Sequence, residues 1–316
     1  MSHSLCVTVL AAAALAAGAG LWLARTAAAT DTVVRYDRES RYYRIRVVDY
    51  PDEGRRCLHF SKSRGIQSSM ILDRPYDLDL RYTQSIIAAL AMHREPKDVL
   101  IVGLGGATLP KFINKQWPGI RLDIVEIDPD VVAVCQKYFH FTGAAGLRVV
   151  IMDGRIYLKR TEKKYDIIML DAYAADHIPF HLTTAEFVRL VHDHLKEGGL
   201  VASNLWEYGL NRFYWAELRT FQQTFPQTYL FEAGTSGNVI VFGTVDAERI
   251  ARDDWVARAR SMADGKELGF DLPNIVRDEY SILTDRKIRE PVLTDDKAPV
   301  DTLRHENPRT YDQNAK

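Results

Sequence analysis

The pattern of apolar and polar positions changes several times along the chain. Residues 1–30 carry almost no charge, whereas residues 33–73 contain short runs in which apolar and polar side chains alternate. Alternation with a period of two predicts a small antiparallel β region. Residues 79–93 carry apolar side chains at the spacing of one helical face, which predicts a helix.

Six apolar runs, separated by longer stretches, follow between residues 96 and 245. These runs cover residues 99–102, 122–125, 147–151, 165–170, 199–203 and 238–242. Apolar strands that alternate with helices are typical of a parallel sheet covered on both faces, and right-handed crossovers then give a doubly wound arrangement. We therefore predict an α/β fold, a Rossmann-like doubly wound sheet preceded by a small antiparallel β domain.

Glycine and acidic residues stand where four of the predicted strands end. The first strand runs into Gly103-Leu-Gly105-Gly106, and glycines there let the backbone turn sharply and approach a ligand closely. The next three strands end at Glu126, at Asp153-Gly154 and at Asp171. Strand ends of this kind share the edge where doubly wound sheets bind ligands. Any one of the acids is explained equally well as a helix cap, but together they predict a nucleoside-binding site.

Each acid suits a different part of a nucleoside. Glu126 can accept a pair of hydrogen bonds from the ribose hydroxyls, and Asp153 can accept one from an exocyclic amine of the base. Composition narrows the partners, because 41 Lys and Arg face 42 Asp and Glu and leave no basic excess for nucleic acid. The three cysteines are too few and too scattered for a disulfide scaffold, and no metal site is expected.

The patterns and the expected site divide the chain into four parts. Residues 1–30 form a hydrophobic anchor or signal segment, and residues 31–80 form the small β domain. Residues 81–245 form the Rossmann-like nucleoside-binding catalytic domain. The charged residues 246–316 are expected to form a C-terminal helical tail.

The N-terminal segment leaves two interpretations open. As a helix, the 21 uncharged residues from Ser4 to Ala24 would reach roughly 30 Å, the thickness of the hydrocarbon core of a bilayer. The Ala27-Ala28-Ala29 tract supplies the cleavage pattern of a signal peptide. No Lys or Arg precedes the segment, however, whereas Arg25 and Arg35 follow it, and this asymmetry favours an uncleaved anchor.

Several segments together resemble the spermidine synthase (polyamine aminopropyltransferase) family, a branch of the class I S-adenosylmethionine-dependent methyltransferase fold. The resemblance runs from about residue 35 to residue 242 and includes the β region, which ordinary methyltransferases lack. The segments that carry it are Glu39-Ser40, Tyr43, Gln67, and residues 99–106, 125–129, 152–154, 165–172 and 195–199. Residues 293–300 also resemble the C-terminal segment of spermidine-synthase-like proteins that carry membrane-spanning segments.

This resemblance implies a reaction and a role for each matched residue. An amine would attack the methylene carbon beside the sulfonium of decarboxylated S-adenosylmethionine, which is a co-substrate, and no cofactor would stay bound. Glu126 matches the acid that binds the ribose, Asp153-Gly154 match the pair that binds adenine, and Gln67 matches a glutamine on the donor side. Gly103 and Gly105 belong to the matched nucleoside-binding loop, and Asp171 matches the proton acceptor.

The match is incomplete on the amine side. The family's D-S-S-D-P-type motif reads Asp171-Ala-Tyr-Ala-Ala-Asp176 here, so Ala174 replaces an aspartate that helps to hold a diamine. Gly106 likewise stands where the glycine loop of the family carries an aspartate. The residues expected to contact the amine are Tyr82, Tyr173 and Asp176, with Tyr76 as an alternative to the first. Because of these departures, methyl transfer from S-adenosylmethionine is an alternative function. A non-catalytic nucleoside-binding module is a further alternative.

The resemblance also bears on where the protein works. A donor made in the cytosol favours the uncleaved anchor, with the enzyme held at the cytoplasmic face of a membrane. A secreted or periplasmic protein, released by signal cleavage, is the alternative. The expected partners are a small-molecule amine and the membrane, with a second copy of the chain as a candidate and nucleic acid excluded.

Overall fold

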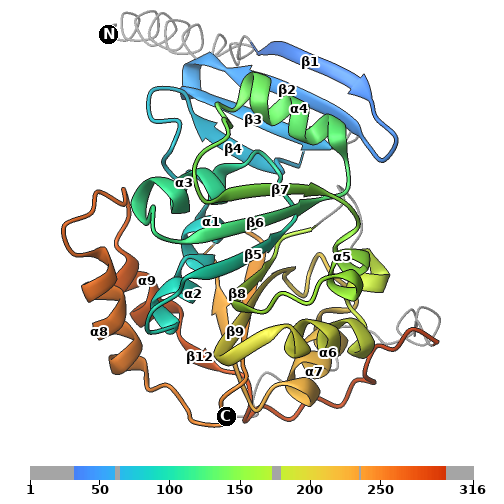
Figure 1. Ribbon diagram of the computed structural model, residues 1–316, viewed down its shortest axis with the longest axis vertical. Helices are drawn as coiled ribbons and strands as arrows, with labels where there is room; N and C mark the ends of the chain where they lie inside the picture. The colour runs from blue at the N-terminus through green and yellow to red at the C-terminus, as the bar shows by residue number, and fades with distance from the viewer. Residues whose placement is uncertain (1–31, 61–64, 173–178, 235, 297–316) are drawn as a thin grey trace, which may run out of the picture.

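The computed structural model describes residues 32–60, 65–172, 179–234 and 236–296, which form two β-sheets with helices around them (Figure 1). The smaller sheet is antiparallel and stands at one end of the molecule. Its strands, in spatial order, are β1 (Val33–Glu39), β2 (Arg44–Tyr50), β3 (Arg55–Phe60) and β4 (Ser68–Ile71). Ile45, Val47 and Leu58 are buried against the rest of the protein, whereas β1 is mostly exposed. The alternation in the sequence therefore marks the face of the small sheet that packs on the core.

The larger sheet has its strands in the order β12-β10-β11-β9-β8-β5-β6-β7. The strands from β9 to β7 in that order are mutually parallel, which confirms the predicted Rossmann-like sheet. They are β5 (Asp98–Val102), β6 (Arg121–Glu126), β7 (Leu147–Ile151), β8 (Tyr165–Leu170) and β9 (Leu195–Trp206). The chain adds β6 on one side of β5 and β8 on the other. The sheet therefore has a switch point at β5 and β8, the place where such sheets bind ligands.

Three strands correct the expectation of a wholly parallel sheet. β10 (Gln227–Glu232), β11 (Asn238–Thr244) and β12 (Ser281–Ile282) run antiparallel to their neighbours. The apolar run at residues 238–242 does form a strand, but only residues 233–237 separate β11 from β10. That connection is too short for a crossover helix, so the two strands pair as a hairpin. β10 and β12 are not among the predicted strands.

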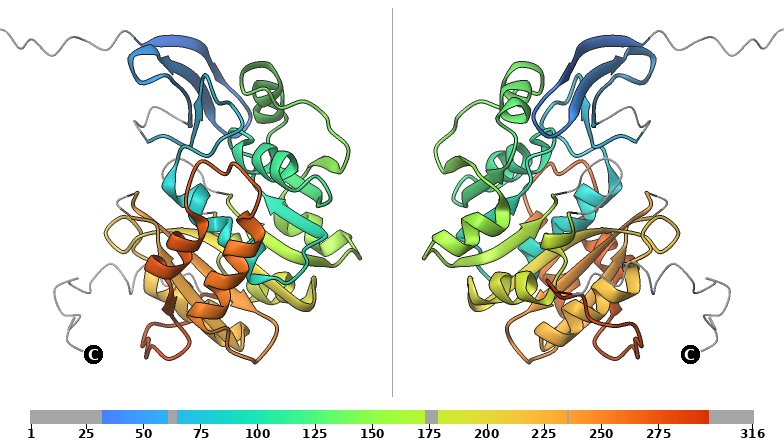
Figure 2. Two further views of the ribbon diagram at one scale, coloured as in Figure 1. Left: turned by 90° about the vertical axis from the view of Figure 1, so that its left-hand side faces the viewer. Right: turned by 90° about the vertical axis from the view of Figure 1, so that its right-hand side faces the viewer.

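Helices cover both faces of the larger sheet and bury two separate clusters of apolar side chains (Figure 2). On one face lie α5 (Gly154–Arg160), α6 (Ala185–Asp193) and α7 (Tyr214–Thr224). The other cluster takes in α1 (Arg81–Ile86), α2 (Ala88–Met92), α3 (Thr108–Gln116), α4 (Pro129–Tyr138), α8 (Arg252–Ala263) and α9 (Leu272–Glu279). Leu100 and Val102 of β5 join the first cluster, whereas Val99 and Ile101 join the second. A strand covered on both faces has no solvent-facing position, which explains its unbroken apolar run.

The helix predicted at residues 79–93 forms two short helices, α1 and α2. Every residue of α2 is buried, because β9 lies on one side of the helix and α8 and α9 lie against it as well. Trp255 of α8 closes the contact by donating from Nε1 to the main-chain oxygen of Ala88 at 3.0 Å. The one-sided helix expected from the spacing is therefore covered on all sides.

The chain after residue 245 returns to the main body at several points. α8 and α9 pack on α2, and β12 extends the larger sheet by pairing with β10. Farther along, Leu293 is fully buried, and its N–H donates to Oγ1 of Thr220 in α7 at 3.1 Å. The expected helical tail thus contains two helices, but it also supplies an edge strand and a buried anchor residue.

The first 30 residues, which carry almost no charge, lie outside the described part of the chain. Among the helices that the structure does describe, none combines the length and the apolar character needed to cross a bilayer. The signal peptide and the uncleaved anchor both stay predictions.

Candidate active site

The carboxyl ends of β5 and β8 meet at the switch point of the larger sheet. Gly103, the first residue after β5, has a φ of +99°, and a Cβ at this position would lie 2.4 Å from the main-chain oxygen of Asp171. No residue with a side chain fits such an approach. The N–H of Asp171 in turn donates to the oxygen of Val102 at 2.9 Å. The glycine therefore lets Asp171 lie directly against the end of β5.

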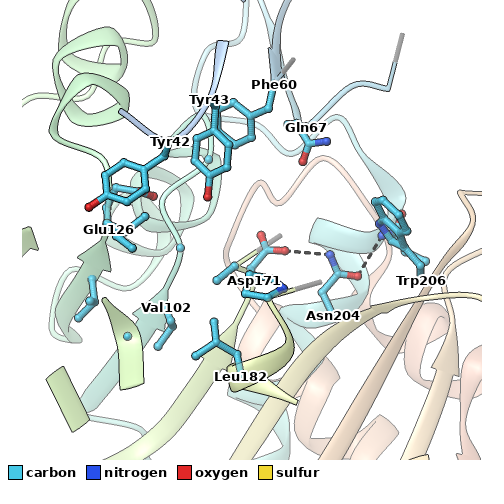
Figure 3. A pocket seen from close by; sticks show the side chains of 18 of the residues that line it. Tyr42, Tyr43, Phe60, Gln67, Val102, Glu126, Asp171, Leu182, Asn204 and Trp206 are labelled. Carbon is cyan, nitrogen blue, oxygen red and sulfur yellow. Dashed lines mark hydrogen bonds between the residues drawn. The ribbon is translucent and has the colours of Figure 1, made fainter. Parts of the chain in front are cut away.

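A cavity of about 760 Å³ opens at this edge and is lined by residues of both sheets (Figure 3). Eight of the ten residues predicted for the site line it, namely Gln67, Tyr82, Gly103, Gly105, Glu126, Asp153, Gly154 and Asp171. The other two, Tyr173 and Asp176, fall within residues 173–178, outside the described part of the chain. A cavity of this volume is in the range that holds small-molecule ligands.

Glu126 occupies the end of β6 and is 7% exposed. One of its carboxylate oxygens accepts the N–H of Leu104 at 2.9 Å, and the other accepts the N–H of Asp128 at 2.9 Å. Burial raises the pKa of Glu126, whereas these main-chain hydrogen bonds lower it. The glycine loop thus holds the carboxylate in one orientation, and each oxygen retains capacity to accept a further hydrogen bond from a ligand.

Asp153 serves as a helix cap and as a wall of the cavity at the same time. Its Oδ1 accepts the N–H of Ile156 in the first turn of α5 at 2.9 Å, which is an N-cap hydrogen bond. Its Oδ2 lies 2.8 Å from Nε2 of His181, and this contact lowers the pKa of Asp153. The helix-cap interpretation of this strand-end acid is therefore confirmed, and its role in binding a nucleoside stays a prediction. His181 also lines the cavity, although its side chain is 48% exposed.

Within the part of the chain that the structure describes, the hydrogen-bond partners of the Asp171 carboxylate are side chains. Its Oδ1 accepts from Nδ2 of Asn204 at 2.8 Å (Figure 3). Its Oδ2 accepts from the Tyr82 hydroxyl at 3.4 Å. Among the described residues that line the cavity there is no Lys or Arg. Burial of the carboxylate in the protein raises the pKa of Asp171 to about 6. The two hydrogen bonds lower this pKa, but their effect is smaller than that of burial.

A second amide fixes the orientation of the first. Nδ2 of Asn238 donates to Oδ1 of Asn204 at 3.0 Å, so the NH₂ group of Asn204 faces Asp171. The strand register pairs Asn238 with Trp206, two residues beyond Asn204, and so places all three side chains on one face of the sheet. Neither asparagine is predicted for the site from the sequence, because the apolar pattern ends the fifth strand at residue 203 and the sixth is expected to be parallel. Asn204 is the residue that directly follows the predicted fifth strand, so its position at a strand end is the signal in the sequence that could have identified it.

The small sheet supplies the opposite wall of the cavity. Tyr43 stacks on Phe60 with ring centroids 4.6 Å apart and an angle of 15° between the rings. Burial raises the pKa of Tyr43 to about 12, so its hydroxyl stays a hydrogen-bond donor at neutral pH. Of the two candidate tyrosines farther along the chain, Tyr82 lines the cavity, whereas Tyr76 is 38% exposed on the surface.

Comparison with known proteins identifies the family to which this cavity belongs. Residues 80–232 match the sequence profile of the spermine/spermidine synthase domain. A polyamine aminopropyltransferase of Vibrio vulnificus (strain CMCP6) is 32% identical over 218 residues, which cover 66% of this chain and 71% of that protein. The chain belongs to the spermine/spermidine synthase family. This membership makes it a transferase and confirms the resemblance found in the sequence.

Solved structures of spermidine synthases share the fold of this family member. The spermidine synthase of Thermotoga maritima superimposes with a TM-score of 0.64 at 23% identity, over 78% of this chain and 84% of that one. A structure of spermidine synthase in complex with the transition state analogue AdoDATO gives a TM-score of 0.63 at 23% identity, over the same fractions. At this level of identity the comparison establishes the fold, with its small sheet and its mixed larger sheet.

The two sides of the cavity in this spermine/spermidine synthase family member are described to different extents. The donor-side residues expected from the resemblance all line the described cavity, whereas the amine side is described at Tyr82 and Asp171 but not at residues 173–178. Within the described residues, no group of His, Cys, Asp and Glu side chains is arranged to hold a metal ion.

Proposed function

We propose that this protein transfers an aminopropyl group from decarboxylated S-adenosylmethionine to a small-molecule amine. The observation that carries the proposal is the carboxylate of Asp171, which faces a cavity of nucleoside size and lacks a Lys or Arg partner among the described lining residues. A desolvated carboxylate without a cationic partner is suited to attract an ammonium group and to accept its proton.

The adenosyl part of the donor would lie across the ends of β5, β6 and β7. Glu126 would accept hydrogen bonds from the ribose hydroxyls, and Asp153 would accept one from the exocyclic amine of adenine. Gly103 and Gly105 leave room for the nucleoside to approach the main chain, with Gln67 contacting the donor from the other wall. The donor would be a co-substrate rather than a resident cofactor, because the reaction consumes it.

Asp171 would act on the attacking amine. A small-molecule amine has a pKa near 10, so at neutral pH it is mostly an ammonium group. The nitrogen has no free lone pair for attack until this group loses a proton. The carboxylate would orient the ammonium group and take that proton, directly or through water. As the new N–C bond forms at the methylene carbon, the C–S bond breaks and its electron pair returns to sulfur. The leaving group is then a neutral thioether, 5′-methylthioadenosine.

The acceptor would lie between Asp171 and the strand end at Trp206. Tyr82 donates its hydroxyl to Asp171 and is placed to contact the reacting nitrogen, and we propose Tyr173 and Asp176 as further contacts of the amine. Both Asn238 and Trp206 line this end of the cavity. The acceptor would be an amine but not necessarily a diamine, since Ala174 stands where the family resemblance places an aspartate that helps to hold a diamine.

We also propose the organisation expected from the sequence, with a β domain at residues 31–80, a catalytic domain at 81–245 and a tail from 246. In this proposal residues 1–30 hold the enzyme at the cytoplasmic face of a membrane, as supported by the arginines that follow the uncharged segment. A reporter fused to the C-terminus would test it. Reporter activity only outside the cytoplasm would exclude this orientation.

Donor binding tests the central proposal. Titration calorimetry of the full chain is expected to show binding of decarboxylated S-adenosylmethionine, and 5′-methylthioadenosine is expected to form when an amine such as putrescine is added. Glu126→Gln is expected to weaken donor binding by tenfold or more, because the lost hydrogen bonds to a charged group contribute about 1.5–3 kcal/mol. Glu232→Gln is the matched control, since Glu232 is an exposed acid at the end of β10. Binding of S-adenosylmethionine alone, with methyl transfer as the product, would overturn the proposal.

A further inference from the structure

A C-terminal strap, residues 293–295, lies against the helices beside the base end of the cavity. At its start, the buried Leu293 accepts the N–H of Ala185 on its main-chain oxygen at 2.8 Å. At its end, the N–H of Asp295 donates to Oε2 of Glu186 at 3.0 Å. The strap is therefore fixed to the first turn of α6 at both of its ends, although α6 precedes it by about 100 residues in the chain.

Asp295 binds the guanidinium of Arg155, the second residue of α5, through both carboxylate oxygens. The distances are 2.7 Å from Nη1 to Oδ1 and 2.5 Å from Nη2 to Oδ2, and Oγ1 of Thr184 donates to the same Oδ1 at 2.8 Å. The side chain of Arg155 is only 12% exposed. The ion pair holds the pKa of Asp295 at about 2, so the carboxylate stays charged at neutral pH. Bidentate pairs of this kind fix geometry as well as contributing energy.

The same guanidinium also contacts the loop that covers the base end. Nη1 of Arg155 donates to the main-chain oxygen of His181 at 3.0 Å, and Nε2 of His181 lies 2.8 Å from Oδ2 of Asp153. Pro179 and Leu182, on either side of His181, line the cavity with it. An unbroken path of polar contacts thus leads from the strap through Arg155 and His181 to the acid expected to receive the base.

We propose that the strap is a positioning element for the donor site, in which Asp295 aligns Arg155 and Arg155 fixes His181 beside Asp153. This inference rests on the proposed function, because it takes Asp153 as the residue that receives adenine. Neither Asp295 nor Arg155 lines the cavity, so both act through His181. A loop that is already ordered loses less conformational freedom when the ligand binds, and the strap therefore increases the affinity for the nucleoside.

A second ion pair offers a matched control. Arg249 and Asp285 also form a bidentate pair, with distances of 2.9 Å and 2.8 Å, and neither residue lines the cavity. Neither of them contacts a residue described here as part of the donor site. Removing Asp285 therefore removes the same kind of interaction without touching the base end.

The test is titration calorimetry of the full chain with 5′-methylthioadenosine, the thioether product of the proposed reaction. Asp295→Asn is expected to weaken binding by three- to tenfold, Asp285→Asn is expected to leave it unchanged, and Asp295→Glu is expected to restore part of it. In steady-state assays the same factor should appear in the KM for the donor. The kcat and the KM for the amine should change by less than twofold, which a general loss of stability would not produce.

The possible outcomes separate this inference from the proposed function. Equal affinities of the wild type and Asp295→Asn would overturn the role of the strap and leave the proposed function standing. Failure of the wild type to bind any adenosyl thioether or sulfonium would overturn the proposed function itself. If Asp295→Asn fails to fold, Arg155→Lys serves instead, because lysine keeps the charge but lacks the planar fork that binds both oxygens of Asp295 while donating to His181. Unchanged donor affinity in that variant would equally overturn the inference.

Discussion

The two ends of the cavity hold their carboxylates in different ways. At the end proposed for adenosine, Glu126 and Asp153 accept main-chain N–H groups, whose positions are set by the fold. At the end proposed for the amine, the donors to Asp171 within the described residues are the side chains of Asn204 and Tyr82. Main-chain donors stay in place whatever the ligand does, whereas side-chain donors can adjust when a carboxylate gains or loses a proton. In terms of the proposed function, the first end is preorganised to bind the donor, whereas the second can respond to a change of charge.

The largest effect on this contrast is expected from Asp171→Asn. An amide cannot accept the proton of the amine, so kcat should fall by about 10²–10⁴-fold, the usual contribution of general base catalysis. The dissociation constant for the donor should stay within about threefold of the wild type, because Glu126 and Asp153 do not depend on Asp171. Product formation measures the first quantity and calorimetry the second. A loss of donor affinity as large as the loss of kcat would show that the two ends are not separable.

A smaller effect is expected from Asn204→Ala, which removes a donor to the Asp171 carboxylate. In the wild type, kcat/KM should rise with pH through about 6, because Asp171 must be deprotonated to act as a base. The N–H of Asn204 stabilises the anion, so its loss raises the pKa of Asp171 and moves the rising limb to higher pH by about one unit.

The measurement for Asn204→Ala is the pH profile of kcat/KM, with Asn114→Ala as the control. Asn114 is an asparagine at the surface whose amide donates to the main-chain oxygen of Ala145. Neither residue lines the cavity. The control should leave the rising limb where the wild type has it. A limb that moves to lower pH in Asn204→Ala would contradict the assignment of the Asn204 amide as a donor.

The smallest effect on turnover is expected at Glu217, a carboxylate of α7 that is 2% exposed. It accepts from Nδ2 of Asn211 at 3.1 Å, and its Oε1 has no hydrogen-bond partner among the described residues. Burial raises its pKa from 4.5 to about 8. The unfolded chain therefore releases this proton at lower pH than the folded protein, and stability is lost as the pH rises from 4.5 through about 8.

Glu217→Gln should remove this loss, since glutamine carries no ionisable proton. Relative to the wild type, the free energy of unfolding should be higher by up to about 4 kcal/mol at pH 8 and similar near pH 4.5, with kcat within twofold. Denaturant unfolding at a series of pH values measures it, and Glu162→Gln at an exposed position is the control. A stability difference that does not vary with pH would contradict a buried, protonated Glu217.

The strands and the acids at their ends follow from the sequence because both depend on local features. A strand covered on two faces must be apolar throughout, as at β5 and β8, and its end is marked by the first glycine or acid. Doubly wound topology then brings Glu126, Asp153 and Asp171 to one edge without any knowledge of distant contacts. The donor end of the cavity was predictable for that reason.

The amine end depends on pairings that no local pattern records. Asn204 faces Asp171 because β11 lies antiparallel beside β9, and Asn238 holds the amide only in that register. The local pattern does not decide between Tyr82 and Tyr76 either, because Tyr76 lies just before the predicted helix and Tyr82 lies in its first turn. The contacts of α1 with β9 and β11 bring Tyr82 to the cavity, and these contacts join segments more than 100 residues apart in the chain.

The burial of α2 has a consequence for the way the chain is synthesised. Ala88 of α2 and Trp255 of α8, which cover each other, are 167 residues apart. Until α8 leaves the ribosome, a segment made only of alanine, leucine and methionine has no partner on that side, and the growing chain presents it to the solvent. Contacts between such distant segments also slow folding, since the intervening chain must be closed into a loop first. We therefore expect a polypeptide truncated before α8 to be prone to aggregation, because α2 would lose the cover that α8 and α9 provide.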